Sequence, residues 1–218
     1  MNTAPQVPKR TLLRRKWWLI PLVLAVAELW HPWVWVSLPV KGHVTDAKTH
    51  HPIAGAVIAG NWSLRGPFSD NPVAHLKLAE TVSDVHGAFV LPGWIAAHIG
   101  YEYLPGRVPE LWVLRRGYVP VRAGNRGVLA SDARPIITTP EQNIELVSAA
   151  DMPLGGYRDE VQSVMWTLVT EFTSTHCALL RLPLLLGEWG ALRTDLAARG
   201  METSALVDDQ TFQAEHCS

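Results

Sequence analysis

The sequence predicts a mainly β protein, in which a sandwich of about seven strands lies between an apolar N-terminal helix and a C-terminal helical hairpin. Three patterns predict this order. Short apolar runs punctuated by Gly and Pro fill residues 37–148, an apolar stretch occupies residues 17–36, and apolar residues recur at helical spacing after residue 157. The chain has 218 residues, 48% of them hydrophobic, which is enough to bury a core.

Residues 1–16 form a basic leader, which we expect to lie in the cytoplasm. They contain five Lys and Arg and no acid, whereas the rest of the chain has fourteen basic and twenty acidic residues. An acidic body lacks the basic face that phosphate backbones require. We therefore expect no nucleic-acid partner.

Residues 17–36 are predicted to be a single membrane-spanning signal anchor. Their only ionisable side chains are Glu28 and His31, and twenty helical residues at about 1.5 Å each match a bilayer core of about 30 Å. The basic leader holds its end in the cytoplasm, so the bulk of the chain crosses the membrane. Tryptophans lie at both ends of the stretch, as an interfacial belt requires: Trp17, Trp18, Trp30, Trp33 and Trp35.

A cleaved signal peptide is the alternative for the same residues. Ala25 and Ala27 fit the small-x-small rule for cleavage before Glu28. Glu28 and Pro32 also weaken the second half of the stretch as a membrane helix. Both alternatives export the body of the protein.

Residues 38–46 are predicted to be the first strand of the sandwich, because Val40, Gly42 and Val44 alternate with polar residues. We expect it to form a hairpin-like pair with the run at residues 54–62. Residues 63–74 are predicted to be a surface loop, and residues 93–107 a long excursion between strands. The other predicted strands cover residues 75–83, 88–91, 111–114, 118–121 and 143–147.

The stretch from Asp84 to Gly87 is predicted to be a hairpin turn and not a reactive site. Asp commonly closes such a turn by accepting hydrogen bonds from its own backbone, and Gly takes the left-handed position. His86 would then point into solvent at the tip of the turn.

Residues 149–200 are predicted to form a helical hairpin. Val161, Met165 and Leu168 belong to an apolar stripe at spacings of three and four, and a second helix begins near Pro183 and continues to Gly200. Residues 201–218 form a polar tail.

Three segments of the chain resemble the motifs of the bacterial carboxypeptidase regulatory-like domain. They are VKGHVTDAKTHHPIAGAVI, ETVSDVHGAFVLPGW and PELWVLRRGYVP, which together span residues 40–147, about half the chain. Members of that family begin V-x-G-x-V-x-D, continue with P-I-x-G-A and carry T-D-x-x-G-x-F. Ser83 stands where that family usually has Thr, and residues 93–107 are longer and more aromatic than in its simplest members. The resemblance implies a transthyretin-like seven-stranded Greek-key sandwich, and its motifs specify fold more than function.

The histidines, aromatic residues and cysteines are the side chains that could carry chemistry. No H-x-x-E or H-E-x-x-H motif is present, so the zinc ligands of a peptidase are missing and we expect no cofactor and no metal site. Trp94, Tyr101 and Tyr103 are the candidate ligand surface, because exposed aromatic rings can stack on sugars. Cys177 and Cys217 are a candidate disulfide in an oxidising compartment; two separate thiols are the alternative.

These observations favour a non-catalytic module of the bacterial cell envelope. The expected arrangement is single-pass in the inner membrane with the bulk of the chain in the periplasm, or periplasmic or secreted after cleavage near Ala27. The sandwich would then present a surface to an envelope protein partner. The alternatives are a carbohydrate- or peptide-binding module and, third, a metal-dependent enzyme.

Overall fold

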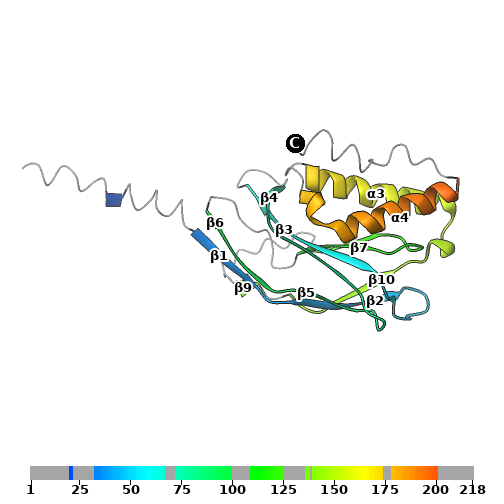
Figure 1. Ribbon diagram of the computed structural model, residues 1–218, viewed down its shortest axis with the longest axis horizontal. Coiled ribbons are helices and arrows are strands. Elements are labelled where there is room, and N and C mark those ends of the chain that lie inside the picture. The colour runs from blue at the N-terminus through cyan, green and yellow to red at the C-terminus, as the bar shows by residue number, and fades with distance from the viewer. Residues whose placement is uncertain are drawn as a thin grey trace, which may run out of the picture.

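The computed structural model describes residues 20–21, 32–66, 72–99, 109–124, 136–137, 139–173 and 178–200. The fold is mainly β: the described strands form three sheets, and a pair of helices covers the four-stranded sheet, which contains β3 and β7 (Figure 1). The strands are β1 (Pro32–Ser37), β2 (Val40–Asp46), β3 (Val57–Arg65), β4 (Pro72–Val82), β5 (Ala88–Leu91), β6 (Trp94–Ile99), β7 (Glu110–Leu114), β8 (Val121–Ala123), β9 (Ile136–Ile137) and β10 (Gln142–Leu146). The helices are α3 (Leu154–Thr173) and α4 (Pro183–Ala198), with short 3-10 turns η1 (Ala149–Asp151) and η2 (Ala178–Arg181).

The central sheet has the antiparallel order β4-β3-β7-β8 and is covered on both faces. Successive residues of β3 point to opposite faces, yet eight of its nine residues are buried. Ile58 and Trp62 pack into the core shared with the second sheet. Val57 and Ala59 pack into a separate core beneath the helices. The molecule therefore has three layers, with β3 near their centre.

The outer layer is one long, interrupted ladder. β1 pairs with β6 up to the pair Ser37 and Trp94, and β2 pairs with β5 from Val40 and Leu91 onward. Only Leu38-Pro39 on one side and Pro92-Gly93 on the other separate the two halves. Proline cannot donate to a ladder, so pairing stops there. β10 and β9 add parallel strands beside β2 and β1.

Helices α3 and α4 confirm the two helices predicted within residues 149–200, and α4 begins at Pro183 as expected. Burying an apolar stripe of each helix against the central sheet stabilises this layer. α4 ends where Gly200, with φ 77°, donates its N–H to the carbonyl of Ala197. The buried positions of the stripes are Tyr157, Val161, Met165 and Leu168 on α3, and Leu185, Trp189, Leu192 and Leu196 on α4.

The N-terminus of α4 is capped by a side chain from the sheet. Leu182, at the cap position, offers no side-chain hydrogen bond. Instead the carboxylate of Glu80 on β4 accepts the N–H of Leu184 at 2.9 Å and of Leu185 at 3.1 Å. These amides have no partner within the helix, and the helix dipole favours a negative charge at this end. Glu80 thus joins the helical layer to the central sheet.

The apolar N-terminal stretch ends earlier than the sequence predicts. The sequence predicts an anchor that includes residues 32–36. The structure shows instead that these residues belong to strand β1, which pairs with β6 along its whole length. Of residues 17–31, the structure describes only Ile20 and Pro21, which are helical. Within the described ranges, no helix combines the length and apolar character needed to cross a membrane.

Two predicted connections are wrong. Residues 63–65 extend β3 and residues 72–74 begin β4, so the loop predicted over 63–74 is much shorter. Trp94–Ile99 is strand β6, in a segment predicted to be an excursion. In both cases tertiary pairing supplied the strand where local composition suggested a loop.

The predicted pairing of neighbouring strands is also wrong. β2 and β3 were expected to form a hairpin-like pair, and β4 and β5 to flank a hairpin turn. β2 and β5 instead pair with each other in the outer layer, while β3 and β4 pair in the central sheet. Alternation identifies the buried face of a strand but not its partner.

Replacing Glu80 by Ala should lower the free energy of unfolding by about 1–2 kcal/mol, because two helix N-terminal amides lose their acceptor. Glu80→Gln keeps one acceptor oxygen and should lose less. Chemical denaturation of the purified protein measures both. Lys77→Ala, on an exposed position of the same strand, is the control and should change stability by no more than about 0.5 kcal/mol. Equal losses in the Ala variants at positions 80 and 77 would contradict the capping role.

Candidate functional site

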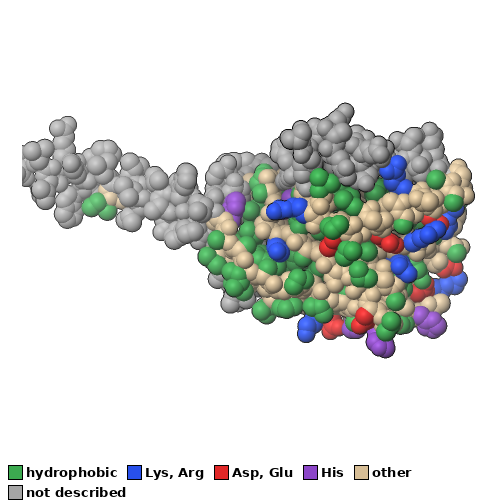
Figure 2. Space-filling model, viewed as in Figure 1, with side chains coloured by type: hydrophobic (Ala, Val, Ile, Leu, Met, Phe, Trp, Pro, Cys, Tyr) green, Lys and Arg blue, Asp and Glu red, His purple; other side chains and the backbone are tan. Residues whose placement is uncertain are grey.

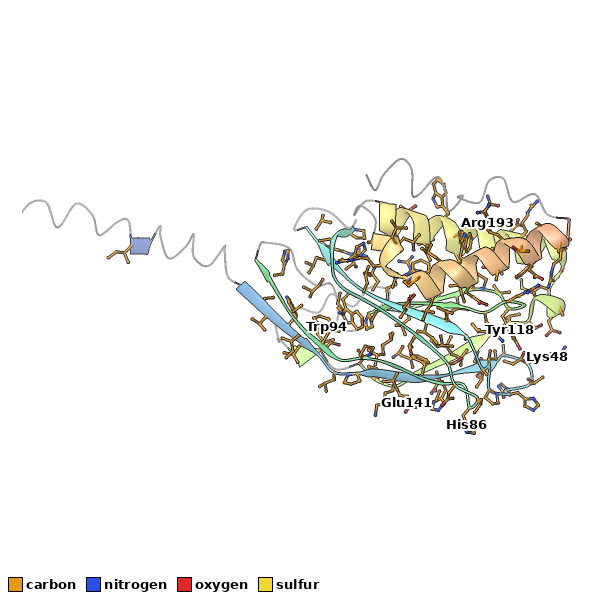
Figure 3. All side chains as sticks on the ribbon, viewed as in Figure 1. Lys48, His86, Trp94, Tyr118, Glu141 and Arg193 are labelled. Carbon is orange, nitrogen blue, oxygen red and sulfur yellow. The ribbon has the colours of Figure 1, made fainter. Side chains whose placement is uncertain are left out.

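The stretch from Asp84 to Gly87 forms a turn, as predicted, but the turn connects two different sheets and does not close a hairpin. The Asp84 carboxylate accepts the N–H of His86 at 2.8 Å and of Ala88 at 2.9 Å. Gly87 has φ 74°, and a Cβ there would lie 2.4 Å from the carbonyl oxygen of Val44. His86 is exposed at the lower edge of the molecule, well away from Trp94 (Figure 3). The corner joins the central sheet to the outer layer.

Trp94 does not offer an open stacking surface. Its side chain is 8% exposed and meets Trp62 edge to face, with ring centroids 5.3 Å apart. It points into the core between the two sheets, so the expectation of a ligand platform at Trp94 is corrected. Tyr101, Tyr103, Cys177 and Cys217 lie outside the described residues. Across the described ranges, no group of three His, Cys, Asp or Glu side chains is placed to share a metal ion.

A row of polar side chains crosses the central sheet on its helix-covered face. We call it the polar row: His75 on β4, Asn61 on β3, Glu110 on β7 and Arg122 on β8, with Glu171 of α3 above it. Nδ1 of His75 donates to Oδ1 of Asn61 at 2.8 Å. Asn61 is 2% exposed and Glu171 is 8% exposed. Both are therefore buried polar side chains.

Arg122 connects the two carboxylates of the row. Its guanidinium bonds Glu110 and lies 3.2 Å from Oε1 of Glu171, and it covers the Trp112 ring at 5.2 Å from the ring centre. Burial raises the pKa of Glu171, and the nearby Glu110 carboxylate raises it further, while Arg122 and Arg65 oppose both effects. The arrangement thus fixes the C-terminal part of α3 to the sheet.

His75 is held neutral by its surroundings. Burial lowers its pKa to about 4, and the positive charge of Arg181 on η2 acts in the same direction. A neutral ring suits a site between the sheet and the helical layer, where a second positive charge would face Arg181. The polar row therefore connects the central sheet to the helical layer.

The sequence contained a weak signal for the row. Glu110 comes directly before the apolar run LWVL, and Arg122 comes directly after the run YVPV. Both residues are thus expected at the ends of strands. Their pairing depends on β7 and β8 lying side by side with Trp112 opposite Arg122. Glu171 comes from a helix forty-nine residues away from Arg122, so no local pattern could show the contact.

The comparisons with known proteins leave the family open. No protein-family model and no curated protein matches this chain. One solved structure, a 9R-lipoxygenase from Cyanothece PCC8801, has 14% sequence identity and a TM-score of 0.26, over 52% of this chain and 17% of the lipoxygenase chain. The chain thus spans less than a fifth of that protein's length, and a structural similarity this low carries no information on fold or activity.

Acidification should destabilise the protein partly through His75. Its folded pKa of about 4 lies below the usual 6.5, so the unfolded chain binds a proton first, and stability falls as the pH drops from about 6.5 toward 4. Because the ring is only partly buried, solvent screening reduces the expected loss between pH 7 and 5 to about 1 kcal/mol. Denaturation at the two pH values measures it.

The variant His75→Gln should not show the fall in stability between pH 7 and 5 that arises from His75. Its side chain can still form a hydrogen bond with Asn61. The difference between the two proteins isolates His75 from Glu171, whose raised pKa makes a contribution of the opposite sign. An identical pH dependence in both proteins would show that His75 is not held neutral.

Replacing Arg122 by Met should lower the free energy of unfolding by about 2–4 kcal/mol, because the largely buried carboxylates of Glu110 and Glu171 then lose the guanidinium that contacts both of them. The double variant Arg122→Met with Glu171→Gln removes that repulsion and should recover part of the loss. A double variant as unstable as the sum of its two single variants would contradict the charge coupling.

Proposed function

We propose that this chain is a non-catalytic, membrane-anchored module of the bacterial cell envelope whose β-sandwich presents a surface to another envelope component. The observation that carries this proposal is that the polar side chains described above have structural roles. Asp84 holds a corner, Glu80 caps a helix, and the polar row joins two layers. In each case a carboxylate makes a contact that holds the fold together.

The proposed fold is the transthyretin-like seven-stranded Greek-key sandwich of the carboxypeptidase regulatory-like domain. In support, the two facing sheets β10-β2-β5 and β4-β3-β7-β8 contain seven strands between them in the described part of the chain. β1, β6 and β9 extend the first of these sheets toward the N-terminus. The helical layer over β3 and β7 is an addition to that sandwich.

The two motifs that carry the family resemblance lie against each other. Gly42 of the V-x-G-x-V segment is the register partner of Phe89 of the D-x-x-G-x-F segment. A Cβ at residue 42 would lie 2.7 Å from the Phe89 ring and 2.1 Å from the carbonyl oxygen of Gln142. Glycine is therefore needed at 42 for Phe89 to pack there, which gives the motifs a physical reason to occur together.

Export is proposed from the leader. Five basic residues precede the apolar residues 17–31, and the acidic body follows. A retained anchor places the sandwich in the periplasm beside the inner membrane. Cleavage near Ala27 would free it there.

A full chain with a C-terminal affinity tag tests the proposal in the bacterial envelope. We expect the tagged chain to stay in the membrane pellet after an alkaline carbonate wash, and to be digested by external protease only once the outer membrane is opened. Detergent extraction should then recover it with a stoichiometric envelope protein. A chain protected from protease inside the cytoplasm would overturn export, and a chain that purifies alone would overturn the partner.

A further inference from the structure

The solvent-facing side of the long outer ladder changes character along its length. In the β1–β6 half, side chains alternate between the core and the outside. Trp35, Trp94 and Ala96 face the core. The outward side chains in the described residues are all apolar: Val34, Val36, Ile95 and Ala97, with Leu38 just beyond the strand.

These outward side chains are well exposed. Val34 is 50% exposed, Leu38 48% and Ile95 74%. They are not needed for the core, which the opposite side of the same strands fills. Figure 2 shows hydrophobic side chains gathered at the lower left of the body, where β1 and β6 lie. Adjacent exposed apolar side chains of this kind mark a contact with another apolar phase or partner.

The β2–β5 half of the ladder is different. Its outer surface, with β10 beside it, carries Lys41, His43 and Glu145 together with the exposed Val90. Nδ1 of His43 lies 3.1 Å from Oε1 of Glu141. Acidic and histidine side chains follow the lower edge toward the right in Figure 2. The change from apolar to charged coincides with the interruption at Pro39 and Pro92.

The apolar half is also the half that the N-terminal apolar stretch enters. β1 begins at Pro32, directly after residues 17–31, with no linker in the sequence between them. Fifteen residues in a helix at about 1.5 Å each extend roughly 22 Å, less than the bilayer core of about 30 Å. A short anchor draws whatever follows it toward the membrane. Such an anchor would hold β1 at the bilayer surface.

We propose that the outward face of the β1–β6 ladder lies in the interfacial layer of the membrane into which its own N-terminal stretch inserts. This inference rests on the proposed anchored function. The lipid surface suits the face because the described outward side chains carry no charge and adjoin the point of membrane exit. The β2–β5 half and its charges would then turn away from the bilayer, toward the periplasm.

Site-specific photocross-linking in vesicles tests the inference with a matched pair of positions. Ile95 and Val85 are both 74% exposed, but Val85 lies in the corner at the far end of the outer layer. The full chain carrying Ile95→p-benzoylphenylalanine or Val85→p-benzoylphenylalanine is reconstituted into phosphatidylethanolamine and phosphatidylglycerol vesicles and irradiated. Mass spectrometry should find about tenfold more lipid adduct at position 95 than at position 85.

Three results would overturn the inference. Equal lipid adducts at both positions in a chain that resists the carbonate wash would refute the membrane face while leaving the anchor in place. An adduct at position 95 with a second copy of the chain would assign the face to a dimer. Release of the chain by the wash would show that the anchor itself fails. Val34→p-benzoylphenylalanine, on the paired strand, repeats the test if the first substitution disturbs β6.

Discussion

The burial of the central sheet on both faces is the constraint on which the other features depend. Ile58 and Trp62 fill one core, and Val57 and Ala59 fill the other, from a single strand. Where both faces of the sheet are covered, as along β3, a buried polar group is costly unless it has a partner. The bond between His75 and Asn61, the Arg122 ion pairs and the Glu80 cap supply such partners on the helix-covered face. The helical layer is therefore part of the folded unit and cannot be treated as an appendage.

Local structure could be predicted from the sequence where it depends only on residues that are close together in the chain. Asp84 and Gly87 form a turn through their own backbone, and Pro183 begins a helix because its ring suits the first turn. The apolar stripe of α3 was readable for the same reason, since spacings of three and four place residues on one face. Each of these features is settled within a few residues of chain.

The arrangement of these pieces was not predictable, because it depends on contacts distant in sequence. Glu80 meets Leu184 across 104 residues, and the partner of β2 proved to be β5 and not its neighbour β3. A tryptophan such as Trp94 can serve a ligand surface or a core, and the position of Trp62 against it shows that it belongs to the core. Composition likewise could not show that residues 32–36 leave the apolar stretch to form a strand, because Trp and Val favour both environments.

The interruption in the outer ladder explains how one half of the ladder can lie on a membrane while the other half does not. Pro39 and Pro92 lie on the two strands where pairing stops, and proline there removes a hydrogen-bond donor from each of them. A ladder without hydrogen bonds at one point can change direction there, so its two halves need not lie in one plane. The apolar half can then follow a flat surface while the charged half, with His43 and Glu141, leaves it. A continuous ladder would carry the charges along the same surface, at a desolvation cost that the break avoids.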